Sequence, residues 1–213
     1  MPALESISLL VDAGRPCGVL GPSGSGKSAL AAALAGTLPL ASGTFTLQPP
    51  TTHPLRVSVL PQGPVLWPRS ARTLWQLLRS DAAQQRGMSN AQQRGMSNAA
   101  LPPGLPDAAL ARLPLPAARR AVLQVLLSLE PDLLIVDEPA ETEANAVREW
   151  RGLISQAAQA GTRVLVLSRN EAVLAACCTD IAILFDGRFA AAGAFTELAP
   201  AAVALAQRRY GSC

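Results

Sequence analysis

Eight residues near the amino terminus have the types and spacing of a phosphate-binding loop. They match the pattern G-x-x-x-x-G-K-[ST] at every fixed position. The glycines let backbone N–H groups turn toward phosphates, and the helix expected to follow adds partial positive charge. Lys27 is expected to reach the β and γ phosphates, and the Ser28 hydroxyl to ligate Mg²⁺. The loop predicts a nucleoside triphosphate site built by Gly21, Pro22, Ser23, Gly24, Ser25, Gly26, Lys27 and Ser28.

Two acidic residues follow an apolar run much later in the chain. Four aliphatic residues, 133–136, precede Asp137 and Glu138, as in a strand of a parallel sheet that is covered on both faces. Ligands of such sheets bind at the carboxyl ends of the strands. Asp137 is therefore expected to hold Mg²⁺, and Glu138 to orient or deprotonate an attacking water. The alternative is a solvated acidic cap at a strand end.

Hydrophobic periodicity predicts strands and helices in alternation, which positions both motifs at strand ends. The predicted strands are residues 7–11, 16–20, 44–47, 57–60, 133–136, 164–167, 181–185 and 188–191. The predicted helices are residues 27–35, 73–78, 117–127, 144–160, 171–176 and 201–208. This alternation implies an α/β fold with a mainly parallel sheet and right-handed crossovers.

Further short motifs, in a fixed order, resemble those of a known family. They are a glutamine after a strand, an acidic pair followed by proline, and two glycines in a late strand pair: Gln62, Asp137-Glu138-Pro139, Gly187 and Gly193. Together with the phosphate loop, they resemble the nucleotide-binding domain of ATP-binding cassette (ABC) ATPases over residues 4–198. The resemblance implies a P-loop NTPase with a mainly parallel sheet core, an antiparallel β edge and a small helical subdomain.

The same resemblance implies function and organisation. Members of that family bind ATP and Mg²⁺, and ATP-driven dimerisation of their domains moves a transmembrane partner. By resemblance, Gln62 would be both a catalytic residue and a metal contact, and it would lie beside the transmembrane subunit. Residues 1–213 would form one domain, with a core lobe at 1–62 and 128–213 and a helical lobe at 63–127.

The chain departs from the family where one domain should bind the nucleotide of the other. The family's Leu-Ser-Gly-Gly-Gln signature should begin at Leu113, where this chain reads Leu-Pro-Leu-Pro-Ala. Pro114 replaces the hydroxyl donor, and Pro116 has no N–H. Pro116 can still begin a helix, because proline fits the first helical turn. We expect weak or absent signature function.

Two further family motifs are altered. Arg169 stands at the position of the family's switch histidine, and a guanidinium stays protonated at ordinary pH, so it cannot shuttle a proton as imidazole does. Arg169 is either a bidentate clamp on a γ-phosphate or an ordinary surface residue at a strand end. The aspartate that couples the two sites in the family is also missing, because residues 141–144 read Glu-Thr-Glu-Ala.

One segment has a composition unlike the rest. The octamer at residues 83–90 is repeated without change at 91–98 and is rich in Gln, Gly, Ser and Asn. Such a composition cannot build a core. Residues 81–107 are therefore expected to form a flexible insert in the helical lobe.

Composition narrows the possible partners. The net charge is only +3, from 18 Lys and Arg against 15 Asp and Glu, and the basic residues are scattered, so no nucleic acid partner is expected. Arg119 and Arg120 are interpreted as the polar face of a helix. The four cysteines lack Cys-x-x-Cys spacing, and no apolar run is long enough to span a bilayer. We expect a cytoplasmic chain with reduced thiols, peripheral to a membrane through a partner.

Three functional hypotheses remain. The first is the ATP-hydrolysing subunit of an ABC transporter, paired with a second ATPase subunit; a distinct partner with an intact signature is favoured over an identical one. The second is a regulatory nucleotide-binding subunit with low turnover, favoured by the altered motifs. The third is a P-loop NTPase outside transport, which Gln62 argues against.

Overall fold

The structure is a computed structural model that describes residues 4–45, 55–62, 70–85, 110–139 and 144–198. Within these residues, one sheet has the strand order β2-β3-β4-β1-β5-β6. All neighbouring strands are parallel except the antiparallel pair β5 and β6. The strands are β1 (Cys17–Leu20), β2 (Val57–Leu60), β3 (Leu133–Asp137), β4 (Arg163–Ser168), β5 (Asp180–Phe185) and β6 (Arg188–Ala194).

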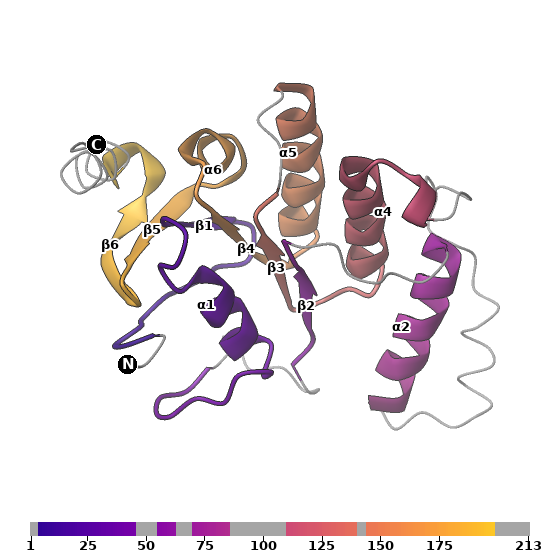
Figure 1. Ribbon diagram of the computed structural model, residues 1–213, viewed down its shortest axis with the longest axis horizontal. Coiled ribbons are helices and arrows are strands. Elements are labelled where there is room, and N and C mark those ends of the chain that lie inside the picture. Colours follow the sequence, from indigo (N-terminus) through magenta and orange to yellow (C-terminus); the bar gives the residue numbers. More distant parts are fainter. Residues whose placement is uncertain (1–3, 46–54, 63–69, 86–109, 140–143, 199–213) are drawn as a thin grey trace.

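Helices cover both faces of this sheet (Figure 1). They are α1 (Lys27–Leu34), α2 (Ala71–Gln85), α4 (Leu115–Leu127), α5 (Ala144–Gln159) and α6 (Glu171–Cys177), with a short 3₁₀ helix η1 (Leu110–Arg112) before α4. α1 lies on one face, whereas α4, α5 and α6 lie on the other. α2 packs against α4 beyond the β2 edge of the sheet.

The side chains of β3 alternate between the two faces of the sheet, which explains why helices pack on both faces. Leu134 and Val136 belong to the core that includes α4, α5 and α6, whereas Leu133 and Ile135 belong to the core that includes α1. Successive side chains of a strand point to opposite faces, so an all-apolar strand fits only a sheet that is covered on both sides. The predicted α/β class, the parallel sheet and the antiparallel edge are confirmed.

Some predicted elements were wrong. Residues 7–11 form no strand in the described part of the chain, although Ile7, Leu9 and Val11 alternate inward against the α1 core. Thr44 and Phe45 are not in a strand, and the rest of the predicted strand 44–47 lies outside the described residues, as does the predicted helix 201–208.

Helix α2 is longer than predicted. The expected helix 73–78 extends to Gln85, so residues 81–85 of the predicted insert are helical. The octamer begins with Ala83, Gln84 and Gln85, and both residue types have high helix propensity. The remainder of the predicted insert, residues 86–107, lies outside the described residues.

Two further expectations concern membrane-spanning segments and the state of the cysteines. No helix among them is long and apolar enough to cross a bilayer. Cys17, Cys177 and Cys178 are buried free thiols, and burial raises the pKa of Cys17 to about 12. Cys213 lies outside the described residues.

Candidate nucleotide site

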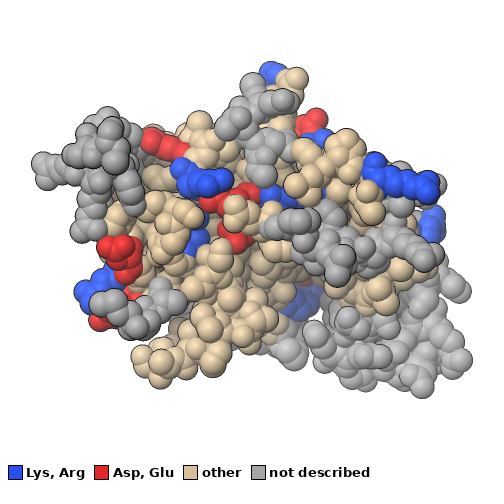
Figure 2. Space-filling model, in the orientation of Figure 1, with Lys and Arg blue, Asp and Glu red and all other residues tan. Residues whose placement is uncertain are grey.

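Four neighbouring strands end at one edge of the sheet, and the predicted site residues lie at these ends. Gln62 lies beyond β2, Asp137 ends β3, Ser168 ends β4, and the phosphate loop follows β1. Because these strands are parallel, their carboxyl ends share one edge, where α/β proteins bind ligands. Charged atoms of both signs gather near the middle of the face viewed in Figure 2.

Glycines shape the phosphate loop by close approach and by a left-handed backbone. A Cβ at Gly21 would lie 2.5 Å from the carbonyl oxygen of Leu184 and 2.6 Å from Ser25 Oγ. Gly26 caps α1 with a φ of 108°, a conformation that favours glycine. Helix α1 therefore begins at Lys27, within the loop, and its first N–H groups have no acceptor within the helix.

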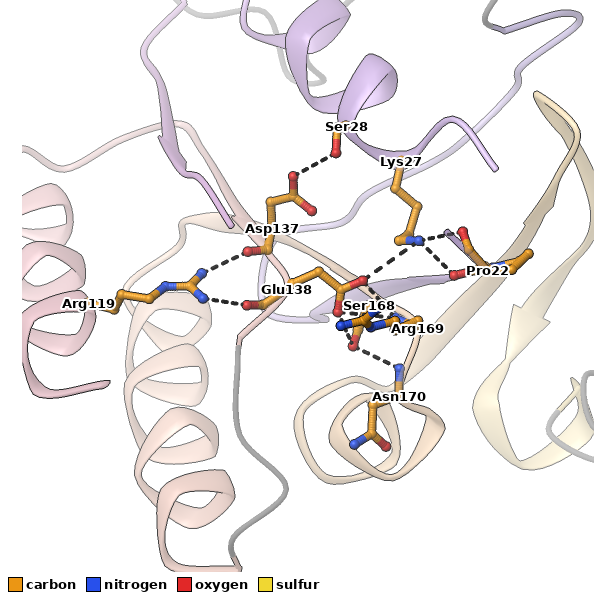
Figure 3. Close-up of polar contacts among 10 residues, drawn as sticks. Pro22, Lys27, Ser28, Arg119, Asp137, Glu138, Ser168, Arg169 and Asn170 are labelled. Carbon is orange, nitrogen blue, oxygen red and sulfur yellow. Dashed lines mark hydrogen bonds and ion pairs between the residues drawn. The ribbon is translucent and has the colours of Figure 1, made fainter. Parts of the chain in front are cut away.

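Lys27 is buried within the phosphate loop, with an exposed fraction of 7%. Its Nζ donates to the carbonyl oxygens of Gly21 at 2.6 Å and Pro22 at 2.9 Å, and lies 3.7 Å from Glu138 Oε1 (Figure 3). Burial lowers the pKa of Lys27, and the charges of Glu138 and Asp137 oppose that shift. The ammonium therefore faces the two carboxylates at the carboxyl end of β3, Asp137 and Glu138.

Ser28 and Asp137 form a pair of oxygen ligands beside Lys27. Ser28 Oγ donates to Asp137 Oδ2 at 3.1 Å. Burial raises the pKa of Asp137, although the Ser28 hydrogen bond acts in the opposite direction. Asp137 Oδ1 is buried without a hydrogen-bond partner among the described residues.

This donor set fits Mg²⁺. The ion prefers oxygen ligands and takes only one or two from the protein, with the rest from water and phosphates. The described residues contain no group of three or more His, Cys, Asp or Glu side chains that would cage a metal ion. The uncompensated oxygen of Asp137 is one that a cation would satisfy.

Glu138 is held in one orientation by groups at the end of β4. Ser168 Oγ donates to Glu138 Oε2 at 3.1 Å, and the Arg169 N–H donates to both carboxylate oxygens at 3.1 and 3.2 Å. Glu138 has a φ of 48°, which is uncommon for a residue with a side chain. The carboxylate is thus directed toward Lys27 rather than into solvent (Figure 3).

The structure separates the other two predicted catalytic residues from this cluster to different degrees. Arg169 contacts Glu138 through its backbone N–H, while its side chain is exposed. Its charge contributes to lowering the pKa of Lys27, so the guanidinium lies within electrostatic reach of the phosphate loop. Gln62 is exposed two residues beyond β2, and no hydrogen bond links it to these residues in the described chain.

The expected signature position is the start of α4. Pro114 is the N-cap of this helix, with no side-chain cap, and Pro116 lies in its first turn, as the sequence suggested. Leu115 is exposed over 47% of its surface. The position therefore presents apolar side chains where a phosphate site needs hydroxyl and N–H donors.

The interpretation of Arg119 as part of a polar helix face was wrong. Arg119 is buried, with an exposed fraction of 1%, and donates to the carbonyl oxygens of Glu138 at 2.6 Å and Asp137 at 2.8 Å. Helical spacing could have indicated the burial of Arg119, because residue 119 shares a face with the buried residues Val122, Leu123 and Leu126. Arg120 is more exposed and pairs with Glu149 at 2.8 Å.

Fold and site together define a P-loop nucleotide-binding domain of the α/β class. The family described as ABC transporter matches residues 4–141, and the chain belongs to this family.

Two curated relatives and one solved structure illustrate the similarity. The zinc import ATP-binding protein ZnuC of Ruegeria sp. (strain TM1040) is 30% identical over 94% of this chain and 78% of its own length. The hemin import ATP-binding protein HmuV of Streptomyces coelicolor is 31% identical over 92% of this chain and 74% of its own length. A dimeric ATP-binding cassette bound to ADP and Pi superposes with a TM-score of 0.70 at 20% identity, over 91% of this chain and 90% of that chain.

Proposed function

We propose that this chain binds and hydrolyses ATP as the ATP-binding subunit of an ABC transporter and thereby drives a transmembrane partner. One observation carries the proposal: the Glu138 carboxylate is held 3.7 Å from the phosphate-loop lysine, next to the Ser28–Asp137 pair. Membership of the ABC transporter family and relatives named as import ATP-binding proteins support it.

Each residue at the sheet edge has a proposed role. The phosphate loop, residues 21–28, binds the triphosphate, and Lys27 neutralises its β and γ phosphates. Ser28, Asp137 and Gln62 would hold Mg²⁺, which when bound neutralises charge on the phosphate oxygens. Glu138 orients or deprotonates the attacking water. Ser168 and the Arg169 N–H keep that carboxylate in place.

The apolar signature position favours a heterodimer. Pro114 and Pro116 leave this chain few donors for a nucleotide held by a partner, so a second, distinct ATPase subunit would complete the site built on Lys27 and Glu138. The solved dimeric cassette shows that a protein of this fold forms dimers. We propose that the assembly lies at the cytoplasmic face of a membrane and binds no nucleic acid. The core lobe (1–62 and 128–213) and the helical lobe (63–127) remain proposals.

Arg169 is proposed to replace the family's switch histidine. Its side chain is exposed, and its charge adds to the lowering of the Lys27 pKa that burial mainly causes. A guanidinium can bind phosphate oxygens bidentately. Arg169→His therefore keeps ATP turnover within about threefold at pH 8 and makes it pH-dependent near pH 6.5, because only imidazole titrates there. An unchanged pH profile together with full activity in Arg169→Ala would remove Arg169 from the mechanism.

Steady-state hydrolysis of Mg-ATP by the purified chain and by Glu138→Gln tests the proposal. Loss of a general base lowers turnover by about 10²- to 10⁴-fold, while nucleotide affinity stays within about threefold. Glu149→Gln is the control, because that carboxylate is exposed and pairs with Arg120. Equal turnover in the unaltered chain and Glu138→Gln would contradict the proposed role.

A regulatory subunit with low turnover is the second candidate, and the apolar start of α4 favours it. Tight binding without turnover in both proteins, alone and with each candidate ATPase partner, would establish that alternative.

The proposed interfacial site is tested by measuring the mass of ATP-bound Glu138→Gln protein in solution. It should rise to that of a dimer when a partner with an intact signature is added. A monomer at high concentration under every condition would exclude the interfacial site.

A further inference from the structure

Arg119 is the most deeply buried charged side chain among the described residues that touches the site. It lies in the second turn of α4, and its guanidinium reaches two consecutive carbonyl oxygens at the end of β3. The guanidinium carbon also lies 5.8 Å from the ring centroid of Trp150 in α5. One side chain thus links α4 to the backbone that carries Asp137 and Glu138 (Figure 3).

These two carbonyl groups stand where the sheet ladder ends. Asp137 is the last residue of β3 paired with β4, and the Glu138 N–H still donates to the Leu167 carbonyl at 2.8 Å. A buried carbonyl without a donor is costly. The planar guanidinium satisfies both carbonyls at once, one from each of its two terminal nitrogens.

The orientation of the Glu138 side chain depends on this backbone. Its φ of 48° lies in the left-handed region, which persists only when the surroundings determine it. The contacts that determine it here come from both sides, with Arg119 on the carbonyl and Ser168 and Arg169 on the carboxylate. Movement of α4 relative to β3 would therefore change the direction of the carboxylate.

We propose that Arg119 is a positioning residue that holds the Glu138 carboxylate toward Lys27 and makes that position depend on where α4 lies. This rests on the proposed hydrolytic role of Glu138. It extends that role, because Arg119 belongs to α4, the helix whose first residues, Pro114–Pro116, stand at the position proposed to face a second ATPase subunit.

The test compares Arg119→Lys with Arg120→Lys, a neighbouring change on a more exposed part of the same helix. Amide exchange is followed by ¹⁵N NMR at Arg169, whose N–H reports on the Glu138 carboxylate, and at Val166, in the centre of β4. Arg119→Lys should exchange the Arg169 proton at least about tenfold faster while Val166 stays within about twofold. Arg120→Lys should leave both within about twofold.

Hydrolysis gives the second readout. Arg119→Lys should lower kcat by about tenfold or more while KM and the Kd of a fluorescent ATP analogue stay within about twofold, since the phosphate loop is untouched. Arg119→Gln, which lacks the charge, should lower kcat further; it also serves if the lysine variant does not fold. Unchanged Arg169 exchange in a folded variant, or exchange that rises equally at Val166, would overturn the proposal whether or not the chain hydrolyses ATP. Failure of the hydrolytic role alone would show as no turnover in the unaltered chain.

Discussion

The carboxylates at the two edges of the sheet differ in how completely they are paired. At the amino ends of the strands, Arg15 pairs with Asp180, and Arg56 pairs with Asp132, each through two side-chain hydrogen bonds. At the carboxyl ends, Asp137 keeps a buried oxygen without a partner among the described residues, and burial raises its pKa.

Charged groups at the amino edge stabilise the folded state, whereas burial at the carboxyl edge destabilises the charged forms. Hydrogen bonds from Arg15 lower the pKa of Asp180, so its ionised form favours the folded state. Burial opposes the charged forms of both Asp137 and Lys27. Strained backbone and incompletely paired charge concentrate at functional sites. At the carboxyl edge, Glu138 has a positive φ and directly follows Asp137, whose Oδ1 has no partner among the described residues.

The largest effect is expected from Gly21→Ala at the carboxyl edge. The new Cβ would lie 2.5 Å from a backbone oxygen of β5, so the loop must move. Nucleotide affinity should fall by about a hundredfold, or about 2.7 kcal/mol, as measured by titration with a fluorescent ATP analogue.

Gly152→Ala is the matched control. This glycine lies in α5 with nothing within 4 Å of an added Cβ, so alanine should raise stability by about 0.5–1 kcal/mol. Normal nucleotide affinity in Gly21→Ala would mean that close packing at the loop does not determine the site.

A medium effect is expected from Asp132→Asn at the amino edge. Asp132 accepts hydrogen bonds from the Arg56 N–H at 2.9 Å and from its guanidinium at 3.1 and 3.3 Å. Weakening these charge-assisted bonds should lower the free energy of unfolding by about 1–3 kcal/mol in urea titrations. Nucleotide affinity should not change; if it fell with stability, the two edges would not be independent.

The smallest effect is expected from Asp180→Asn, because its partner Arg15 is largely exposed. The pKa of Asp180 is lowered in the folded state, so its contribution is present above the unfolded value of about 3.9 and is lost as pH falls through the folded pKa. Urea midpoints of the two proteins should differ slightly at pH 7 and converge near pH 2. A gap that widened on acidification would reverse the assigned sign.

Local patterns predicted the carboxyl edge well because its main residues directly follow buried strands or form a contiguous loop. The phosphate loop, Asp137 and Glu138 all lie where strand ends and motif spacing placed them. Arg119 was missed because its contact with residues 18 and 19 positions later arises from packing of α4 on β3. The sequence did contain an indication of this contact, because Arg119 is a charged residue on an otherwise apolar face of α4.

The remaining errors also have physical causes. Residues 7–11 alternate in burial as a strand would, but alternation does not supply a pairing partner. The first residues of the octamer continue α2, because helix propensity there outweighs the low-complexity composition of the whole repeat. Gln62 and Arg169 were placed by resemblance, and a strand end alone does not determine where their long side chains point.

Thermal unfolding of Asp137→Asn, with and without Mg-ATP, tests most directly whether the carboxyl edge holds charge at the expense of stability. The raised pKa means that the unfolded chain releases this proton first as pH rises, so the carboxylate disfavours folding at neutral pH. The account predicts a higher Tm for Asp137→Asn than for the unaltered chain without ligand, and a smaller increase on adding Mg-ATP. A lower Tm without ligand, or an undiminished response to Mg-ATP, would contradict it.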